Sequence, residues 1–405
     1  MPAMPLSTGV TSFCSGVIDY MGMNPNAEKK GKFKKMTERL CAPLSEIPKA
    51  LEKTGFPLEF SVADDFRKAG WEVIGSRYYI DDFDGRAREL DLVSYRIIKT
   101  DDIDICTVIL ISCKKDAENT WAFLSTEKPS EDANVDWEPV HHWTDFEPLS
   151  SYLSNSDWKV QYLHENNSIF DTVFRTTRNI FASQLVSSDG KSPKNDKPIF
   201  DSITGLLKAL DHEILALPNR MKGQKRIYLF TLATIVDAPM VDVQYKQNET
   251  KAIEIHRLSH LARFMVRKRE VAALIHFVRK DKTGEFIQQM SLLADHNAEH
   301  IKSAVVKSFE AVRTNKKVQE YFSKKLESRL KFRINRKIEE LGIQDEMTKL
   351  QLSYTNNCLS IELDVESETA NTLNSHEPTR GLVQKELAEI VRYKGKFLVD
   401  WDIFF

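Results

Sequence analysis

The sequence predicts a mixed α/β fold with an accessory α+β part and a helical C-terminal region. Three observations carry this prediction. Strand-favouring runs separated by Asp- and Gly-rich turns lie between residues 71 and 113. An amphipathic stretch at 199–217 precedes a continuous apolar run at 226–236. Residues 284–341 interleave charged groups with an apolar stripe at helical spacing, which is typical of surface helices.

The first predicted element that bears on function is a helix over residues 57–69, with Pro57 in its first turn. Val62 and Phe66 share one face of this helix, and Glu59 lies three residues before Val62. Glu59 is therefore expected to face the sheet rather than the solvent. A carboxylate on the inner face of a helix is unusual and marks this residue as a candidate.

A meander of three antiparallel strands is expected next, over residues 71–80, 87–98 and 105–113. The first strand contains Trp, Val, Ile and Tyr and is followed by a turn rich in Asp and Gly. The third strand is almost wholly apolar, which is typical of a central strand buried on both faces.

The register of the last two strands decides which polar side chains meet. With their turn centred on residues 101–102, Asp91 falls across from Ser112. Side chains alternate faces along a strand, so Ser112 and Lys114 point the same way, and Lys115 points the opposite way. A lysine that ends so apolar a strand either extends to water or meets a carboxylate, and Asp91 is the available partner. From spacing alone, the competing interpretation is a buried Asp–Lys ion pair that merely closes the sheet.

Together these segments resemble a known family. The helix carrying Glu59 is followed by Gly-Trp-Glu-Val, Tyr-Tyr-Ile-Asp-Asp-Phe-Asp-Gly, Arg-Glu-Leu-Asp-Leu and Ser-Cys-Lys. This combination resembles the PD-(D/E)xK nuclease superfamily, and within it the Mrr-like branch of restriction endonucleases, over roughly residues 55–125. The resemblance implies a restriction-endonuclease-like core and hydrolysis of DNA with Mg²⁺ or Mn²⁺. It also implies a setting in prokaryotic defence.

The resemblance implies a role for each residue at a matching position. Asp91 would be the metal carboxylate, and Lys114 the lysine that polarises the attacking water. Glu59 would assist metal binding, and the backbone carbonyl of Cys113 would be a further ligand. The family has an acidic residue or Gln where this chain has Ser112, and a hydroxyl is a poor substitute for a carboxylate on Mg²⁺. Either Glu59 supplies the second carboxylate, or the site is degenerate and the protein is a nucleic-acid-binding or assembly module.

Basic residues near these segments are candidates for binding nucleic acid, with DNA favoured. Lys115 and Arg88 flank the predicted site, and Lys34 and Lys35 belong to a basic cluster that leads into an N-terminal helix. The alternative for that cluster is a solvated helix start.

Histidines provide a competing metal hypothesis. His296, Glu299 and His300 match the HxxEH pattern of zinc peptidases, in which two His share a helix face. No obvious downstream motif supplies a third ligand. His141 and His142 are adjacent, so their side chains are expected to point apart in an extended chain.

Four regions are predicted along the chain. They are an N-terminal arm and basic helix (1–45), a restriction-endonuclease-like domain (46–190), an α+β continuation (199–283) and a helical C-terminal region with a small hairpin (284–405). The continuation is either the closing half of the same domain or a small unit beside it. Helices are also expected over 150–165 and 168–186. The mixed-charge helical region is a candidate surface for a homo-oligomer or a defence-complex partner.

Composition limits the remaining classes. The chain has 405 residues, 41% of them apolar, which indicates a globular protein with a sizeable core. Its net charge of −2 gives no overall attraction to nucleic acid, so a binding surface must be a local patch. The five cysteines are scattered, which suits a reducing compartment. No apolar run approaches the roughly 20 residues of a membrane span, so we expect a cytoplasmic protein without a membrane partner.

Overall fold

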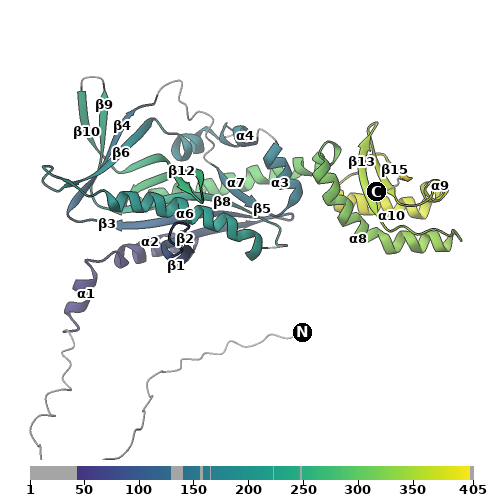
Figure 1. The fold of residues 1–405 in the computed structure, drawn as a ribbon, viewed down its shortest axis with the longest axis horizontal. Coiled ribbons are helices and arrows are strands. Elements are labelled where there is room, and N and C mark those ends of the chain that lie inside the picture. The colour runs from purple at the N-terminus through teal and green to yellow at the C-terminus, as the bar shows by residue number, and fades with distance from the viewer. Residues whose placement is uncertain are drawn as a thin grey trace, which may run out of the picture. The chain divides into compact units, whose positions relative to one another are not determined.

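The computed structural model describes residues 43–128, 140–155, 158–164, 166–221, 223–246 and 249–401, and its elements are labelled in Figure 1. The chain divides into two compact units, Met1–Ala50 and Leu51–Phe405. Most of the first unit, including Lys34 and Lys35, lies outside the described residues. Helix α1 (Glu46–Leu51) begins near the C-terminal end of the first unit, and none of its side chains is buried.

Helix α2 (Phe56–Lys68) confirms the first predicted element, with a proline in its first turn. The helix is followed by Gly70, whose φ of 81° is left-handed. The next residue, Trp71, donates its backbone N–H to the carbonyl of Phe66 at 3.0 Å, which closes the helix and directs the chain into the sheet. Leu58, Val62, Ala63 and Phe66 form its buried face.

The largest sheet contains both antiparallel and parallel pairs. In spatial order its strands are β1 (Glu72–Ile80), β2 (Ala87–Lys99), β3 (Asp104–Lys115), β8 (Arg226–Asp237), β12 (Arg269–Arg279) and β11 (Arg257–Val266), with β5 (His141–Thr144) paired to β8. Strands β1, β2 and β3 form the predicted antiparallel meander. Strand β8 is parallel to both β3 and β12. The sheet is therefore mixed, and the α/β fold class is confirmed.

Helices cover both faces of this sheet. Along β3, Val108 and Leu110 belong to the apolar cluster that includes α6 (Lys197–Arg220). Ile109 and Ile111 belong to the opposite cluster, with α2 and α7 (Thr283–Glu310). Strands β8, β11 and β12 thus continue the meander's own sheet, whereas β9 and β10 between them belong to a second sheet. Helix α7 begins at Thr283, next to the boundary predicted at residue 284, and packs into the core of this sheet.

A second sheet has the order β10 (Glu249–Ile255), β9 (Met240–Lys246), β4 (Asn119–Glu127), β6 (Arg178–Ser187) and β7 (Pro193–Lys194). The helix predicted over 168–186 is wrong. Only α5 (Asn167–Ile169) and a π-helical turn (Phe170–Phe174) are helical there, and the chain becomes extended at Arg175. The remainder of the predicted helix belongs to β6, which pairs with β4. Helices α3 (Glu147–Asn155) and α4 (Trp158–His164) match the prediction over 150–165.

The C-terminal region combines helices with a small sheet. Strands β13 (Leu350–Thr355) and β14 (Cys358–Leu363) form the predicted hairpin, and Asn356 and Asn357 make its turn with φ of 52° and 58°. Strand β15 (Phe397–Trp401) adds to β14 in parallel. The helices are α8 (Lys316–Glu340), α9 (Ser367–Ser375) and α10 (Glu377–Glu386), with short 3₁₀ or π turns at Lys280–Lys282, Ala311–Arg313 and Leu387–Val391.

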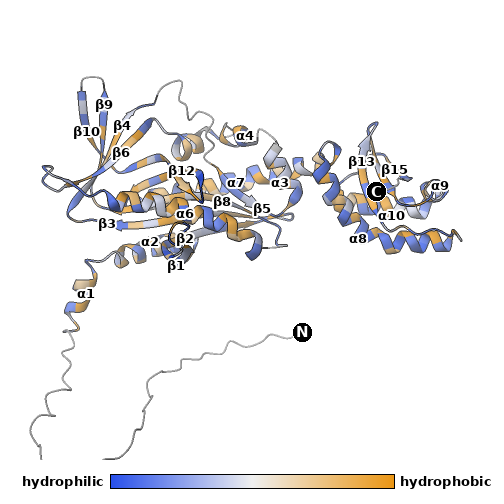
Figure 2. Ribbon diagram, viewed as in Figure 1, coloured by the Kyte–Doolittle hydropathy of each residue, from blue (hydrophilic) through white to orange (hydrophobic). Residues whose placement is uncertain are grey.

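Apolar and polar residues alternate around helices such as α6 and α8, as Figure 2 shows. This alternation is typical of helices with one face in a core and the other in solvent. Within the described residues, none of the helices combines the length and the apolar character needed to cross a membrane.

Candidate active site

The β2–β3 register places the candidate residues at the end of the paired segment. The ladder runs from Lys99 opposite Asp104 to Leu92 opposite Ile111, so its turn is centred on residues 101–102 as predicted. The next pair in this register is Asp91 and Ser112. The β2–β3 ladder stops just before this pair, and Ser112 remains paired with Thr234 of β8 on its other side.

The Asp91 carboxylate accepts two hydrogen bonds and makes one ion pair at the end of β3. Its Oδ2 atom accepts the backbone N–H of Cys113 at 2.6 Å and the hydroxyl of Ser112 at 3.2 Å. The Lys114 ammonium lies 3.7 Å from the same oxygen. The Asp91 and Lys114 side chains keep 18% and 30% of their surface exposed, so solvent and solutes reach both. The predicted meeting of these three residues is confirmed.

Glu59 reaches the same end of the strands from helix α2. Burial is the main cause that raises the pKa of its carboxyl above the ordinary value, and the negative charges of Asp91 and Glu89 add to it. The Lys114 ammonium acts in the opposite direction. Within the described part of the chain, no hydrogen bond or ion pair holds the Glu59 carboxylate. The carboxylates of Asp91 and Glu59 repel each other, and Glu59 has no cationic partner among the described residues. A bound cation would therefore reduce this repulsion.

The donor set for a metal ion is incomplete. No group of three or more His, Cys, Asp or Glu side chains converges among the residues that the structure describes. Asp91 lines the cavity beside Lys114 and Glu59 does not, although the charge of Asp91 acts on the pKa of Glu59. These two are the carboxylates that the sequence suggests for an ion, and Mg²⁺ is usually held by one or two carboxylates, with water and phosphate oxygens completing its shell. Cys113 contributes no side chain, because its thiol is buried and burial raises its pKa well above the ordinary value.

The basic residues predicted to bind nucleic acid lie in different places. Lys115 points away from Asp91, as expected, and donates to the backbone carbonyl of Glu52 at 2.5 Å. Arg88 borders the site, but it is paired with Asp84 at 2.7 Å and with Asp81 at 3.4 Å. Neither side chain is therefore an uncommitted cation.

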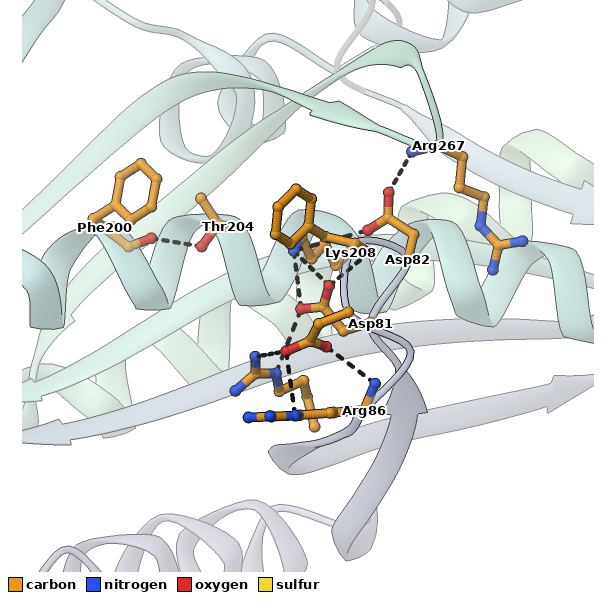
Figure 3. Close-up of polar contacts among 10 residues, drawn as sticks. Asp81, Asp82, Arg86, Phe200, Thr204, Lys208 and Arg267 are labelled. Carbon is orange, nitrogen blue, oxygen red and sulfur yellow. Dashed lines mark hydrogen bonds and ion pairs between the residues drawn. The ribbon is translucent and has the colours of Figure 1, made fainter.

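A cavity of about 430 Å³ opens beside the Asp91–Lys114 pair. One wall consists of Asp91, Ser112 and Lys114, and the opposite wall is the first half of α6 with Lys208. Sequence reasoning missed this second wall. Figure 3 shows the Lys208 ammonium beside the carboxylates of Asp81 and Asp82.

The second wall is held by a buried ion pair. The Lys208 ammonium lies 2.9 Å from one oxygen of Asp81 and 3.8 Å from Asp82. Burial acts to raise the pKa of Asp81, but hydrogen bonds from Lys208 and from the backbone of Phe83 lower it below the ordinary value. The charge of Arg88 acts in the same direction. Asp81 therefore stays ionised and joins α6 to the end of β1.

The histidine hypotheses do not fit the geometry. His296 contacts the carbonyl of Tyr162 at 3.1 Å, and the ring of His300 packs edge-on against the Tyr162 ring. Glu299 is exposed to solvent, while both histidines are buried. His142 packs against Trp158, and burial lowers its pKa to about 4, so it is neutral at pH 7. Among the described residues these side chains fill a core.

Replacing Glu59 by glutamine is expected to stabilise the fold slightly at neutral pH. The folded protein raises the pKa of Glu59, so the charged form is disfavoured in the fold, and stability falls as pH rises through the folded pKa. The gain should be less than about 1 kcal/mol, because the side chain is partly exposed. It should vanish below the ordinary pKa of 4.5, where both states are protonated. Urea unfolding at neutral and acidic pH measures this.

Asp65→Asn is the control, because it removes a carboxylate six residues further along the same helix. A loss of stability in Glu59→Gln at neutral pH would contradict the assigned environment of Glu59.

Comparison of the chain with protein-family models, curated proteins and solved structures finds no match in any of the three.

Proposed function

We propose that the protein is a metal-dependent nuclease that hydrolyses phosphodiester bonds, with DNA as the favoured substrate. One observation carries the proposal. Asp91 and Lys114 meet at the end of a buried strand, beside an open cavity, and burial together with the charge of Asp91 raises the pKa of the Glu59 carboxyl. Carboxylates and a lysine at one point suit cleavage of a phosphodiester with a divalent ion.

The order of elements supports the proposal. An inward-facing glutamate on α2 is followed by the β1–β2–β3 meander within a mixed sheet, as the resemblance to PD-(D/E)xK nucleases implies. A role in prokaryotic defence rests on that resemblance alone. The basic, solvent-exposed face of α8, which includes Phe332, is the surface we propose for a second copy or a partner.

Each residue has a defined task in this mechanism. A bound divalent ion would hold the scissile phosphate and lower the pKa of a water molecule. Asp91 and Glu59 would hold the ion from β2 and α2. The Lys114 ammonium would orient the attacking water or stabilise the charge that develops on the phosphate. Ser112 donates to Asp91 and so acts as a positioning residue, which fixes the orientation of that carboxylate.

A second candidate function is favoured by the same serine. Ser112 offers Asp91 a hydrogen bond where the resembling family has an acidic residue or Gln, and Oδ2 of Asp91 already accepts two hydrogen bonds and pairs with Lys114. A protein of this kind would keep the fold and bind nucleic acid, or assemble with a partner, without cleaving.

Asp91→Asn is expected to abolish metal-dependent cleavage, because the amide cannot replace the charge that holds the ion. We expect the wild type to cleave supercoiled plasmid or single-stranded oligonucleotides with Mg²⁺ or Mn²⁺, and the variant to be at least about 100-fold slower. Mg²⁺ should also raise the melting temperature of the wild type and not of the variant, because only the wild type binds the ion.

Asp101→Asn, in the exposed β2–β3 turn, is the matched control and should behave as the wild type. Absence of both cleavage and a Mg²⁺-dependent shift in the wild type would reject the nuclease and leave the binding module.

A further inference from the structure

The cavity beside Asp91 and Lys114 has features that the cleavage reaction does not need. It extends from the reacting end of β2 and β3 to the first half of α6 and to Phe264 of β11. Its volume of about 430 Å³ lies within the roughly 300–1,000 Å³ typical of pockets that enclose one small ligand. A nucleoside monophosphate belongs to that size class.

An aromatic pair forms the apolar part of the cavity. The rings of Phe200 and Phe264 come from different elements and meet edge to face, with centroids 5.9 Å apart and planes at 80°. Phe200 is 52% exposed, whereas Ile199 and Thr204 of the same helix are buried. The Lys208 ammonium lies 5.8 Å from the centroid of the Phe264 ring, which leaves the exposed Phe200 for a ligand. Exposed aromatic rings in a basic groove are platforms on which unpaired bases stack.

An uncommitted cation lies beside the aromatic pair. Lys208 and Arg88 are neutralised by Asp81 and its neighbours. Lys197, which also lines the cavity, is exposed and forms no ion pair in the described part of the chain. Lys197 can therefore pair with a phosphate bound beside Phe200, in a cavity that the carboxylates of Glu89, Asp91 and Asp201 also line.

A strained basic turn extends the positive charge beyond the cavity. Arg267 and Lys268 join β11 to β12 with φ of 50° and 63°, a left-handed conformation that disfavours residues other than glycine. Two carboxylates keep the turn in place. The backbone N–H of Arg267 donates to Asp82 at 2.6 Å, and its guanidinium pairs with the buried Asp211 at 2.9 Å. Figure 3 shows Asp82 between Arg267 and Lys208, and Lys208 lines the cavity.

We propose that the cavity binds one unpaired nucleotide of a single-stranded nucleic acid, with its base on Phe200 and its phosphate at Lys197. The inference rests on the proposed function in one respect: the phosphate that is cleaved would lie at Asp91 and Lys114. A cavity enclosed by the sheet, α6 and β11 admits a base only after it has left the double helix. The substrate class is therefore a single strand, or a splayed region of a duplex, rather than intact double-stranded DNA.

Binding without cleavage tests the proposal. Fluorescence anisotropy is measured with the full-length protein in EDTA, using labelled 20-residue oligothymidylate, oligouridylate and a DNA duplex of equal length. We expect either single strand to bind at least about tenfold more tightly than the duplex. Phe200→Ala should weaken single-strand binding about tenfold, the loss expected for one stacked base. Lys197→Gln should reduce the salt dependence of binding by about one phosphate contact.

The chain offers matched controls. Phe181 of β6 is 57% exposed and meets Tyr245 edge to face with centroids 5.5 Å apart, so Phe181→Ala removes an equivalent aromatic pair elsewhere. Lys302→Gln removes an exposed lysine of α7. Both should bind as the wild type.

The outcomes separate this inference from the proposed cleavage. A preference for single strands that depends on Phe200, in a protein that cleaves nothing, supports the inference and rejects the nuclease. If the protein cleaves but Phe200→Ala binds single strands as tightly as the wild type, the inference is overturned and the nuclease stands. Equal binding of duplex and single strands has the same meaning. Binding of thymidine monophosphate, measured by calorimetry, without any binding of oligonucleotides would assign the cavity to a free nucleotide and also overturn the inference.

Discussion

Lys114→Ala is expected to lower the rate of phosphodiester cleavage by about 100- to 1,000-fold, the typical loss when one group that stabilises transition-state charge is removed. The Lys114 ammonium is the cation that lies beside Asp91, at 3.7 Å, and it faces the cavity. Single-turnover cleavage at saturating protein measures the effect on the chemical step. Arginine at this position should not restore the rate, because its planar, larger head cannot occupy the place of an ammonium.

Lys115→Ala is the matched control for this variant. The two lysines are neighbours of equal charge, but Lys115 donates to the carbonyl of Glu52 on the other face of the sheet. Its removal should leave the rate unchanged. Neither variant should lose more than about 1 kcal/mol of stability, because both side chains are partly exposed. Equal losses of activity in the two variants would show that charge in general, rather than the position of Lys114, matters.

The part of the site that lies on neighbouring strands could be predicted from the sequence. The turn at residues 101–102 sets the register, and the register alone brings Asp91 to Ser112 and Lys114. Period-two alternation then separates Lys114 from Lys115. These rules act over about twenty residues of chain, so no knowledge of tertiary packing is needed.

The opposite wall of the cavity could not be predicted in this way. Lys208 and Asp81 are 127 residues apart, and nothing in the local pattern of either marks the pairing. Asp81 has the sequence context of an ordinary turn residue. The prediction of a helix where β6 lies was wrong for a related reason. Ile169, Val173 and Ile180 are spaced as in a helix, but pairing with β4 makes the chain extended after Phe174. Tertiary pairing overrides local propensity in both places.

Ser112→Glu is expected to strengthen the binding of Mg²⁺ by about 30-fold. Ser112 faces Asp91 at 3.2 Å and lines the cavity, so a glutamate there places a further carboxylate beside the proposed ion. Even at the dielectric constant of water, one more negative charge about 4 Å from a divalent ion adds about 2 kcal/mol of attraction. The Mg²⁺ dependence of the melting temperature gives the change in affinity, and the cleavage assay shows whether activity rises with it.

Without metal the same substitution should destabilise the fold by about 1–2 kcal/mol. It removes the hydrogen bond from Ser112 to Asp91 and sets two carboxylates side by side. Ser112→Gln is the control, because it has the size of glutamate without the charge, and it should show the loss of stability from the missing hydrogen bond but no gain in affinity for Mg²⁺. A metal response of Ser112→Glu no larger than that of Ser112→Gln would mean that the ion does not bind beside Asp91. Activity gained only in Ser112→Glu would identify the natural site as degenerate, whereas activity already present in the wild type would assign the second carboxylate to Glu59.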